Sequence, residues 1–122
     1  MKCDISVGEM LDKISILRIK RLKIVDEAKL CHVRKELAVL EAQVVDLPGC
    51  ESIIQRLADV NLALWDTEDA IRRKEAAKQF DEEFIRLARS IYRTNDRRFE
   101  IKNEANCRFS SELQEQKSYD KY

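Results

Sequence analysis

Long helical periodicity with almost no interruption is the feature that most constrains this chain. Apolar residues alternate at spacings of three and four before the Pro48–Gly49 pair, at Leu30, Val33, Leu37, Leu40, Val44 and Leu47. The same spacing resumes after that pair, at Ile53, Leu57, Val60, Leu64, Thr67 and Ile71. This spacing predicts the seam of a coiled-coil-like helix, and Pro next to Gly predicts a turn. We therefore expect the two segments to form an antiparallel helical hairpin.

A first helix is predicted upstream of this hairpin, over residues 7–25. Ser6 and Glu9 have the spacing of a capping box, in which each side chain binds the backbone amide of the other residue. Most apolar residues of this helix share one broad face, but Ile16 and Ile19 lie nearly opposite. Such a helix either sits centrally in a bundle or lends its second side to another subunit. Its main stripe is rotated by roughly 140° from that of the next segment, which predicts a break capped by Asp26; a bent continuous helix is the alternative.

Asp81 is predicted to cap a fourth helix that runs to about Cys107, with Phe80 packed on Ile85 as a hydrophobic staple. Only two Gly and one Pro occur among 122 residues, of which 38% are charged, so little in the chain breaks a helix. The predicted fold is all-α: an antiparallel helical hairpin within a four-helix up-down bundle. One domain is expected over residues 1–108, followed by a polar tail over 109–122 that frays unless Tyr119 or Tyr122 docks.

Some apolar side chains exceed what a single small bundle is expected to bury. These are Ile16, Ile19, Ile54, Leu62 and Trp65. Surplus apolar surface of this kind marks interaction sites. The leading functional hypothesis is therefore a structural or protein-interaction module that forms a homo-oligomer, a dimer or larger, through the second faces of its first and third helices.

Along one face of the fourth helix, the side chains change from apolar to polar. Its apolar stripe ends at Ile91, and Asn95, Arg98, Lys102 and Asn106 continue it within about 40°. Buried cations and amides must be paired or solvated. Three interpretations follow: the helix outruns its neighbours and these residues face water; Arg98 and Lys102 pair with carboxylates; or the line forms an anion-binding pocket. The candidate carboxylates are Asp12, Glu9 and Asp66.

The anion-binding interpretation combines two basic helices. Lys13 and Lys20 share one side of the first helix and would join Asn95, Arg98 and Lys102 of the fourth. Arginine and lysine suit phosphate or carboxylate groups, and asparagine can bind a neighbouring hydroxyl. The alternative function is therefore an anion-binding protein, or an enzyme that uses this cluster. No nucleophile lies beside a base, so no catalytic residue can be named and enzyme status stays open.

Composition argues against several other classes of function. The 23 basic and 23 acidic side chains cancel, and the basic helices lack interleaved aromatic residues, so no nucleic-acid partner is expected. No apolar run approaches the roughly 18 residues of a membrane span, and no signal-peptide pattern opens the chain. Four scattered cysteines without a CxxC pair, with one His, predict no metal site and no cofactor. We expect a cytoplasmic protein with free thiols.

Three segments carry a resemblance to a known family: SVGEMLDKISILRIK, FIRLARSIYRTNDRRFEIKNEAN and the terminal KSYDKY. Together they resemble a family of small helical proteins of bacteria and their phages that has no established activity. The resemblance covers most of the chain and implies no catalytic residue. It implies instead that one recurring set belongs together, namely Asp12, Lys13, Lys20, Asn95, Arg98, Lys102, Lys117 and Tyr119. The chain departs from the family pattern at Ala105, where a larger aliphatic residue is expected.

Overall fold

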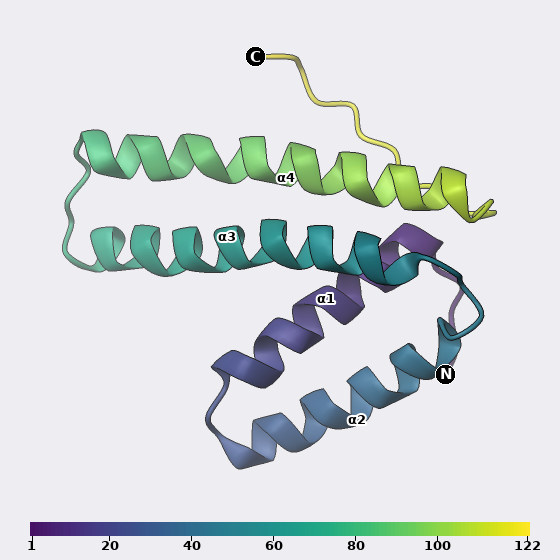
Figure 1. Ribbon diagram of the computed structural model, residues 1–122. Helices are drawn as coiled ribbons and strands as arrows, with labels where there is room; N and C mark the ends of the chain where they lie inside the picture. Colours follow the sequence, from purple (N-terminus) through teal and green to yellow (C-terminus); the bar gives the residue numbers. More distant parts are fainter.

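The computed structural model describes all 122 residues and contains four α-helices and no β-strand (Figure 1). Their bounds are α1 Val7–Lys23, α2 Glu27–Gln43, α3 Cys50–Ala76 and α4 Glu82–Arg108. The all-α prediction is therefore confirmed. No helix combines the length and the apolar character needed to cross a membrane.

Side-chain caps set three of the four helix starts. The Oγ of Ser6 accepts from the Glu9 amide at 3.1 Å, and Asp26 and Asp81 cap α2 and α4 in the same way, each at 3.0 Å. The break at Asp26 is thus confirmed, and one continuous helix is excluded. The capping box at Ser6 is only half formed, because the Glu9 carboxylate pairs with Lys102 of α4 instead. At the α4 start, the ring of Phe80 makes an edge contact with Phe84.

The third helix follows the predicted turn. Gly49 adopts the left-handed conformation, with φ at 81°, directly before α3 begins. Residues with a Cβ rarely tolerate this region, whereas Gly does so without strain. The predicted turn at the Pro48–Gly49 pair is therefore present and leads into α3, but α2 ends earlier, at Gln43, so Val44 and Leu47 of the predicted seam lie in the connection.

The helices form two antiparallel pairs of unequal length. Figure 1 shows α3 and α4 as a long hairpin, with α1 and α2 as a shorter pair set at an angle against one end of it. The first helix is central: α1 packs against all three others, whereas α2 packs against α1 alone. A central position in the bundle was one of the two possibilities predicted from the two apolar sides of this helix.

The two ends of the α3–α4 hairpin differ in how much covers them. We call residues 50–61 and 94–108, on which α1 lies, the base, and residues 62–76 and 82–93 the arm. Every fully buried residue of α3 lies at or before Asn61, and Leu87 is the one buried residue of α4 within the arm. The arm is consequently a pair of helices that pack on each other and little else.

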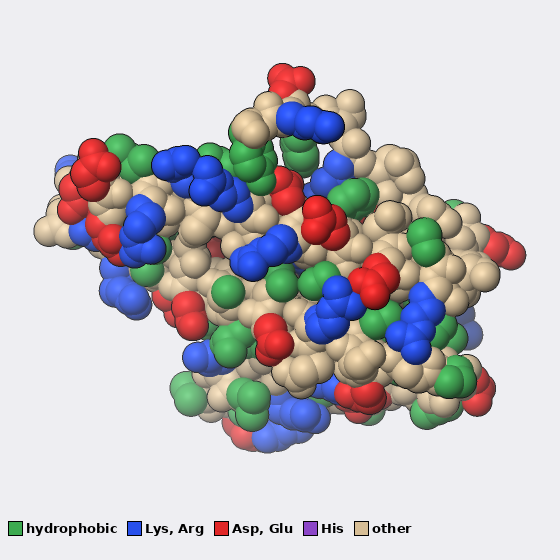
Figure 2. Space-filling view, turned by 45° about the horizontal axis from the view of Figure 1, so that its top comes forward, with side chains coloured by type: hydrophobic (Ala, Val, Ile, Leu, Met, Phe, Trp, Pro, Cys, Tyr) green, Lys and Arg blue, Asp and Glu red, His purple; other side chains and the backbone are tan.

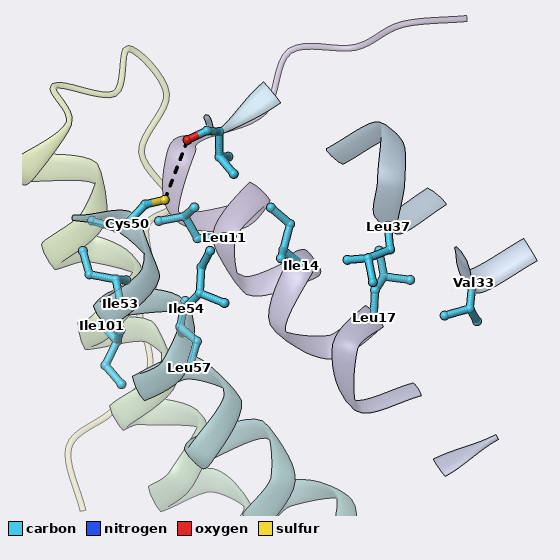
Figure 3. Close-up of a cluster of buried hydrophobic side chains, with 12 residues drawn as sticks. Leu11, Ile14, Leu17, Val33, Leu37, Cys50, Ile53, Ile54, Leu57 and Ile101 are labelled. Atoms are coloured by element: carbon cyan, nitrogen blue, oxygen red, sulfur yellow. Dashed lines mark hydrogen bonds between the residues drawn. The ribbon is translucent and has the colours of Figure 1, made fainter. Parts of the chain in front are cut away.

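The apolar core lies between α1 and the base. In Figure 3, Leu11 and Ile14 of α1 point toward Ile54 and Leu57 of α3. The core comprises Leu11, Ile14, Leu17, Val33, Leu37, Val44, Cys50, Ile53, Ile54, Leu57, Ile101 and Ala105. Ala105 is fully buried, so the small residue at this position fits a closely packed turn rather than a gap.

Two residues assigned to an extra apolar surface are in fact part of the monomer interior. Ile54 is 0% exposed and Ile19 is 7% exposed. The prediction failed because α1 crosses α3 at an angle, so that more than one side of each helix is covered. The interior also holds Cys50, whose thiol lies 3.8 Å from the carbonyl oxygen of Val44 (Figure 3). All four cysteines are free thiols, as expected.

The tail after Arg108 turns back along α4. Ser110 has a positive φ of 50°, and the amide of Ser111 donates to the Asn106 carbonyl at 2.8 Å. At the far end, the Tyr122 hydroxyl donates to Asp96, and its ring makes an edge contact with Tyr92. Docking of the tail through Tyr122, one of the two predicted anchors, is therefore observed.

Candidate functional site

The polar line of α4 lies at the base, where α1 and α4 meet. Lys102 and Asn106 are buried, and Asn95 and Arg98 are partly buried. These side chains therefore do not extend past their neighbours into water, and the interpretation that placed them in solvent is wrong. The carboxylate-pairing interpretation is confirmed for two of its three candidate acids, Asp12 and Glu9. Asp66 lies exposed on α3 and takes no part.

A buried carboxylate holds the first of these cations. Asp12 is 0% exposed and accepts two hydrogen bonds from Arg98, Nε to Oδ1 at 2.9 Å and Nη2 to Oδ2 at 2.6 Å. Such a bidentate pair is the strongest form of charge-assisted bond between side chains. The hydrogen bonds that Arg98 donates to Asp12 raise the pKa of the Arg98 guanidinium, although burial opposes the shift. Arg98 is consequently a fixed, permanently charged group.

An amide and a hydroxyl complete the surroundings of Asp12. The Nδ2 of Asn61 donates to Asp12 Oδ1 at 2.9 Å and to the Oγ of Ser15 at 2.8 Å. The Ser15 hydroxyl in turn donates to the backbone carbonyl of Asp12 at 2.6 Å. Because both carboxylate oxygens of Asp12 accept hydrogen bonds, the buried charge is tolerated. The network joins α1, α3 and α4 in one register.

The second cation, Lys102, is only 7% exposed. Its Nζ lies 2.8 Å from Glu9 of α1 and 2.6 Å from Glu115 of the tail. Burial acts to lower the pKa of Lys102, but the bonds to Glu115 and Glu9 together outweigh it, and the pKa is raised. The ammonium is thus charged and enclosed by the protein's own carboxylates.

A close contact between α1 and α4 beside Lys102 explains why a glycine occupies position 8. The amide of Gly8 donates to Asn106 Oδ1 at 2.6 Å, and Asn106 is 1% exposed. A Cβ at Gly8 would lie 2.3 Å from the carbonyl oxygen of Lys102. Only glycine allows α1 and α4 to approach this closely.

The five residues predicted to bind an anion do not converge on one point. Arg98 and Lys102 are engaged as described, and Lys13 pairs with Glu36 of α2 at 3.0 Å. Lys20, near the end of α1, has no ion-pair partner. The side-chain amide of Asn95 makes no hydrogen bond within the chain. The helix wheel placed Lys13 correctly on α1 but could not show that α2 would cover that side. Anion binding itself stays a prediction.

One hollow at the junction of base and arm does bring two of the five together. It has a volume of about 450 Å³ and is lined by Ile16, Ile19, Asn61, Leu64, Trp65, Glu68, Asp69, Arg72, Asn95 and Arg98. Two nitrogens of Arg98 are used by Asp12, which leaves Nη1 without a partner in the protein. The hollow therefore combines an apolar wall with a fixed guanidinium, a free amide and a rim that carries Arg72 and the acids Glu68 and Asp69. We call it the junction hollow.

Sequence reasoning missed Asn61 and Glu115. Asn61 lies four residues after Leu57 and three before Leu64, so an amide on the seam of α3 was a signal available in the spacing. Glu115 lies in the tail, which has no periodicity, and nothing local marks it. No group of three or more His, Cys, Asp and Glu side chains is placed to hold a metal ion.

The fold and the buried polar network define a small all-α bundle protein whose helices are held in register by ion pairs. The chain belongs to a family of unknown function, DUF6165, whose family model matches residues 1–122. No curated protein matches the chain, and no solved structure does.

Proposed function

We propose that the protein is a helical interaction module that self-associates through the junction hollow and the adjoining side of the arm. The observation that carries this proposal is the arm itself, in which half of a long hairpin stands clear of the other helices. An isolated helix pair that buries only Leu87 fully presents apolar surface that another chain can cover.

The proposed surface is narrower than the sequence suggested, since Ile19 and Ile54 are buried within the monomer. Its remaining apolar side chains are Ile16, Leu62 and Trp65. Leu62 is 40% exposed and lies one helical turn before Trp65, which is half-buried at the wall of the junction hollow. A large aromatic ring beside a hollow is the kind of group that anchors an interface.

A second copy of this chain fits the charges on this surface. The rim of the hollow carries both signs, with Glu68 and Asp69 next to Arg72 on α3. A two-fold axis across the arm would place the arginine of each copy near the acids of the other, which gives a self-complementary interface. The net charge of zero adds no long-range repulsion between copies.

Sedimentation equilibrium at micromolar protein tests this proposal. We expect a mass above the 14.3 kDa of one chain. Leu62→Asp should shift the mass to that of the monomer, because a carboxylate would be desolvated in the interface. Leu22→Asp is the matched control: Leu22 is 82% exposed on α1 and lies outside the surface. A parent protein of 14.3 kDa at every concentration would overturn the proposal.

A second candidate function is anion binding in the same hollow. It is favoured by the unpartnered Nη1 of Arg98 and the free amide of Asn95, which both line the hollow. Thermal shift with inorganic phosphate and with succinate tests it. We expect stabilisation of the parent protein and none of Asn95→Ala, and equal shifts in both proteins would refute it. Lys13 and Lys102 have no role in this version of the site.

A further inference from the structure

A row of arginines follows the outer face of α4 from the arm into the start of the base. Arg86, Arg89, Arg93 and Arg97 have spacings of three, four and four, and we call them the arginine ridge. At a rise of about 1.5 Å per residue the row from Arg89 to Arg97 spans about 12 Å of helix. Figure 2 shows basic side chains gathered over the N-terminal half of α4, beside the C-terminal tail.

The protein neutralises only one end of this ridge. Arg86 pairs with Glu83, whereas Arg89, Arg93 and Arg97 pair with no carboxylate. No acidic residue lies between Glu83 and Asp96. Like charges at i and i+4 destabilise a helix, so the ridge is unfavourable for α4 alone. A bound anion would remove that repulsion.

The ridge is the wall of a hollow rather than a bare helix surface. A volume of about 840 Å³ is lined by the four arginines together with Glu82, Glu83, Ile85, Ser90, Thr94 and Tyr122. The tail brings Tyr122 to this place, and the guanidinium of Arg93 lies 5.8 Å from the centre of its ring. This hollow, which we call the ridge hollow, therefore carries four cations against two acids, together with hydroxyl groups and one aromatic edge.

A second hollow begins on the other side of the same tyrosine. It has a volume of about 960 Å³ and lies between α4 and the tail, lined by Ile91, Tyr92, Asn95, Asp96, Phe99, Glu100, Lys117, Tyr119, Asp120, Lys121 and Tyr122. Four of these residues are aromatic. Its two lysines face three acids, so this hollow has no excess of positive charge for a second anion. Lys117 lies over the rings of Phe99 and Tyr119, 5.7 Å and 5.6 Å from their centres, so a neutral planar ring would stack on Tyr92 or Tyr122.

We propose that the two hollows together bind a nucleoside polyphosphate. The phosphates lie along Arg89, Arg93 and Arg97, since guanidinium groups bind phosphate oxygens bidentately. The nucleobase lies in the second hollow, beyond Tyr122, where the free amide of Asn95 can donate hydrogen bonds to its edge and accept them from it. This site shares only Asn95 with the self-association surface, and its test does not depend on the oligomeric state.

Calorimetric titration of the full chain with ATP and with tripolyphosphate tests the proposal. We expect ATP to bind more tightly than tripolyphosphate, because the nucleobase adds stacking. The triple variant Arg89→Gln, Arg93→Gln, Arg97→Gln should bind neither. Its matched control is Arg21→Gln, Lys23→Gln, Lys35→Gln, which removes the same charge from exposed positions of α1 and α2 and should bind ATP as the parent does. The single variant Arg93→Gln, with weaker ATP binding, supports the same conclusion if the triple variant fails to fold.

The variant Tyr122→Ala distinguishes binding of the nucleobase from binding of the phosphates. Loss of stacking should weaken the affinity for ATP by about tenfold and leave the affinity for tripolyphosphate unchanged. Absence of ATP binding to the parent, or equal ATP affinity in the parent and the ridge variants, would overturn the site. Equal affinity for ATP and tripolyphosphate would overturn the nucleoside part of the assignment.

Discussion

The base and the arm belong to the same two helices, yet they are built differently. At the base, α1 covers the hairpin, and the buried polar groups between them include Asp12 of α1 with Asn61 and Lys102 of the hairpin. In the arm, apolar residues of the same seam, such as Leu64 and Ile71, are only partly buried. The seam alone therefore does not determine burial, because a third helix is needed to close it.

The same difference separates the polar chemistry of the two regions. Charges at the base are enclosed and satisfied by partners from three segments of the chain. Charges on the arm face solvent, and most of its arginines have no partner. Specific packing is thus concentrated at the base, and surface available for binding is concentrated on the arm.

Removal of the buried carboxylate should have the largest effect. Asp12→Ala leaves Arg98 and Asn61 without their acceptor in the interior, and breaking a buried pair in this way costs about 3–5 kcal/mol. Chemical denaturation would measure this loss. Asp81→Ala, which removes an exposed carboxylate from the start of the arm, is the comparison and should cost much less. Equal losses would mean that base and arm do not differ in this respect.

A pair of identical substitutions compares apolar packing in the two regions. Ile53 is 1% exposed at the base, whereas Ile71 is partly buried in the arm. Ile53→Ala should lower the free energy of unfolding by about 2–5 kcal/mol. Ile71→Ala should lower it by less than half as much. Urea denaturation of both variants gives the comparison, and a larger loss for Ile71→Ala would show that the arm carries a core of its own.

The smallest expected effect is a pH dependence of stability from Lys102. Its pKa is raised above the ordinary 10.5, so its stabilising contribution is fully present below pH 10.5 and is lost as the pH rises through the higher folded-state value. The unfolding free energy should therefore fall in alkaline solution. Lys102→Met should show a shallower fall over the same range. Identical slopes would indicate that Lys102 does not have a raised pKa.

Local signals in the sequence predicted most of the secondary structure. Ser6, Asp26 and Asp81 marked three helix starts, and the Pro48–Gly49 pair marked the turn, because caps and turns depend on neighbouring residues. The wheel also indicated that Arg98 lies on the line of the core, and its partner Asp12 was one of the three candidate acids.

What the sequence could not provide was the angle between the two helix pairs. That angle buries Ile19 and Ile54 and leaves Trp65 at the edge of a hollow. It results from the sum of many side-chain contacts, including the close approach at Gly8, and no short motif encodes it. The position of Glu115 depends likewise on the path of the tail.

The equal lengths of α3 and α4, 27 residues each, affect how this fold can change during evolution. An insertion in one helix alone would shift every seam residue of the arm out of register. Matched insertions of about two turns in both helices would keep the seam facing inward, because the 3–4 spacing repeats over that length. Such paired insertions leave the base untouched. Arm length is thus a property that relatives of this chain can vary independently of the core.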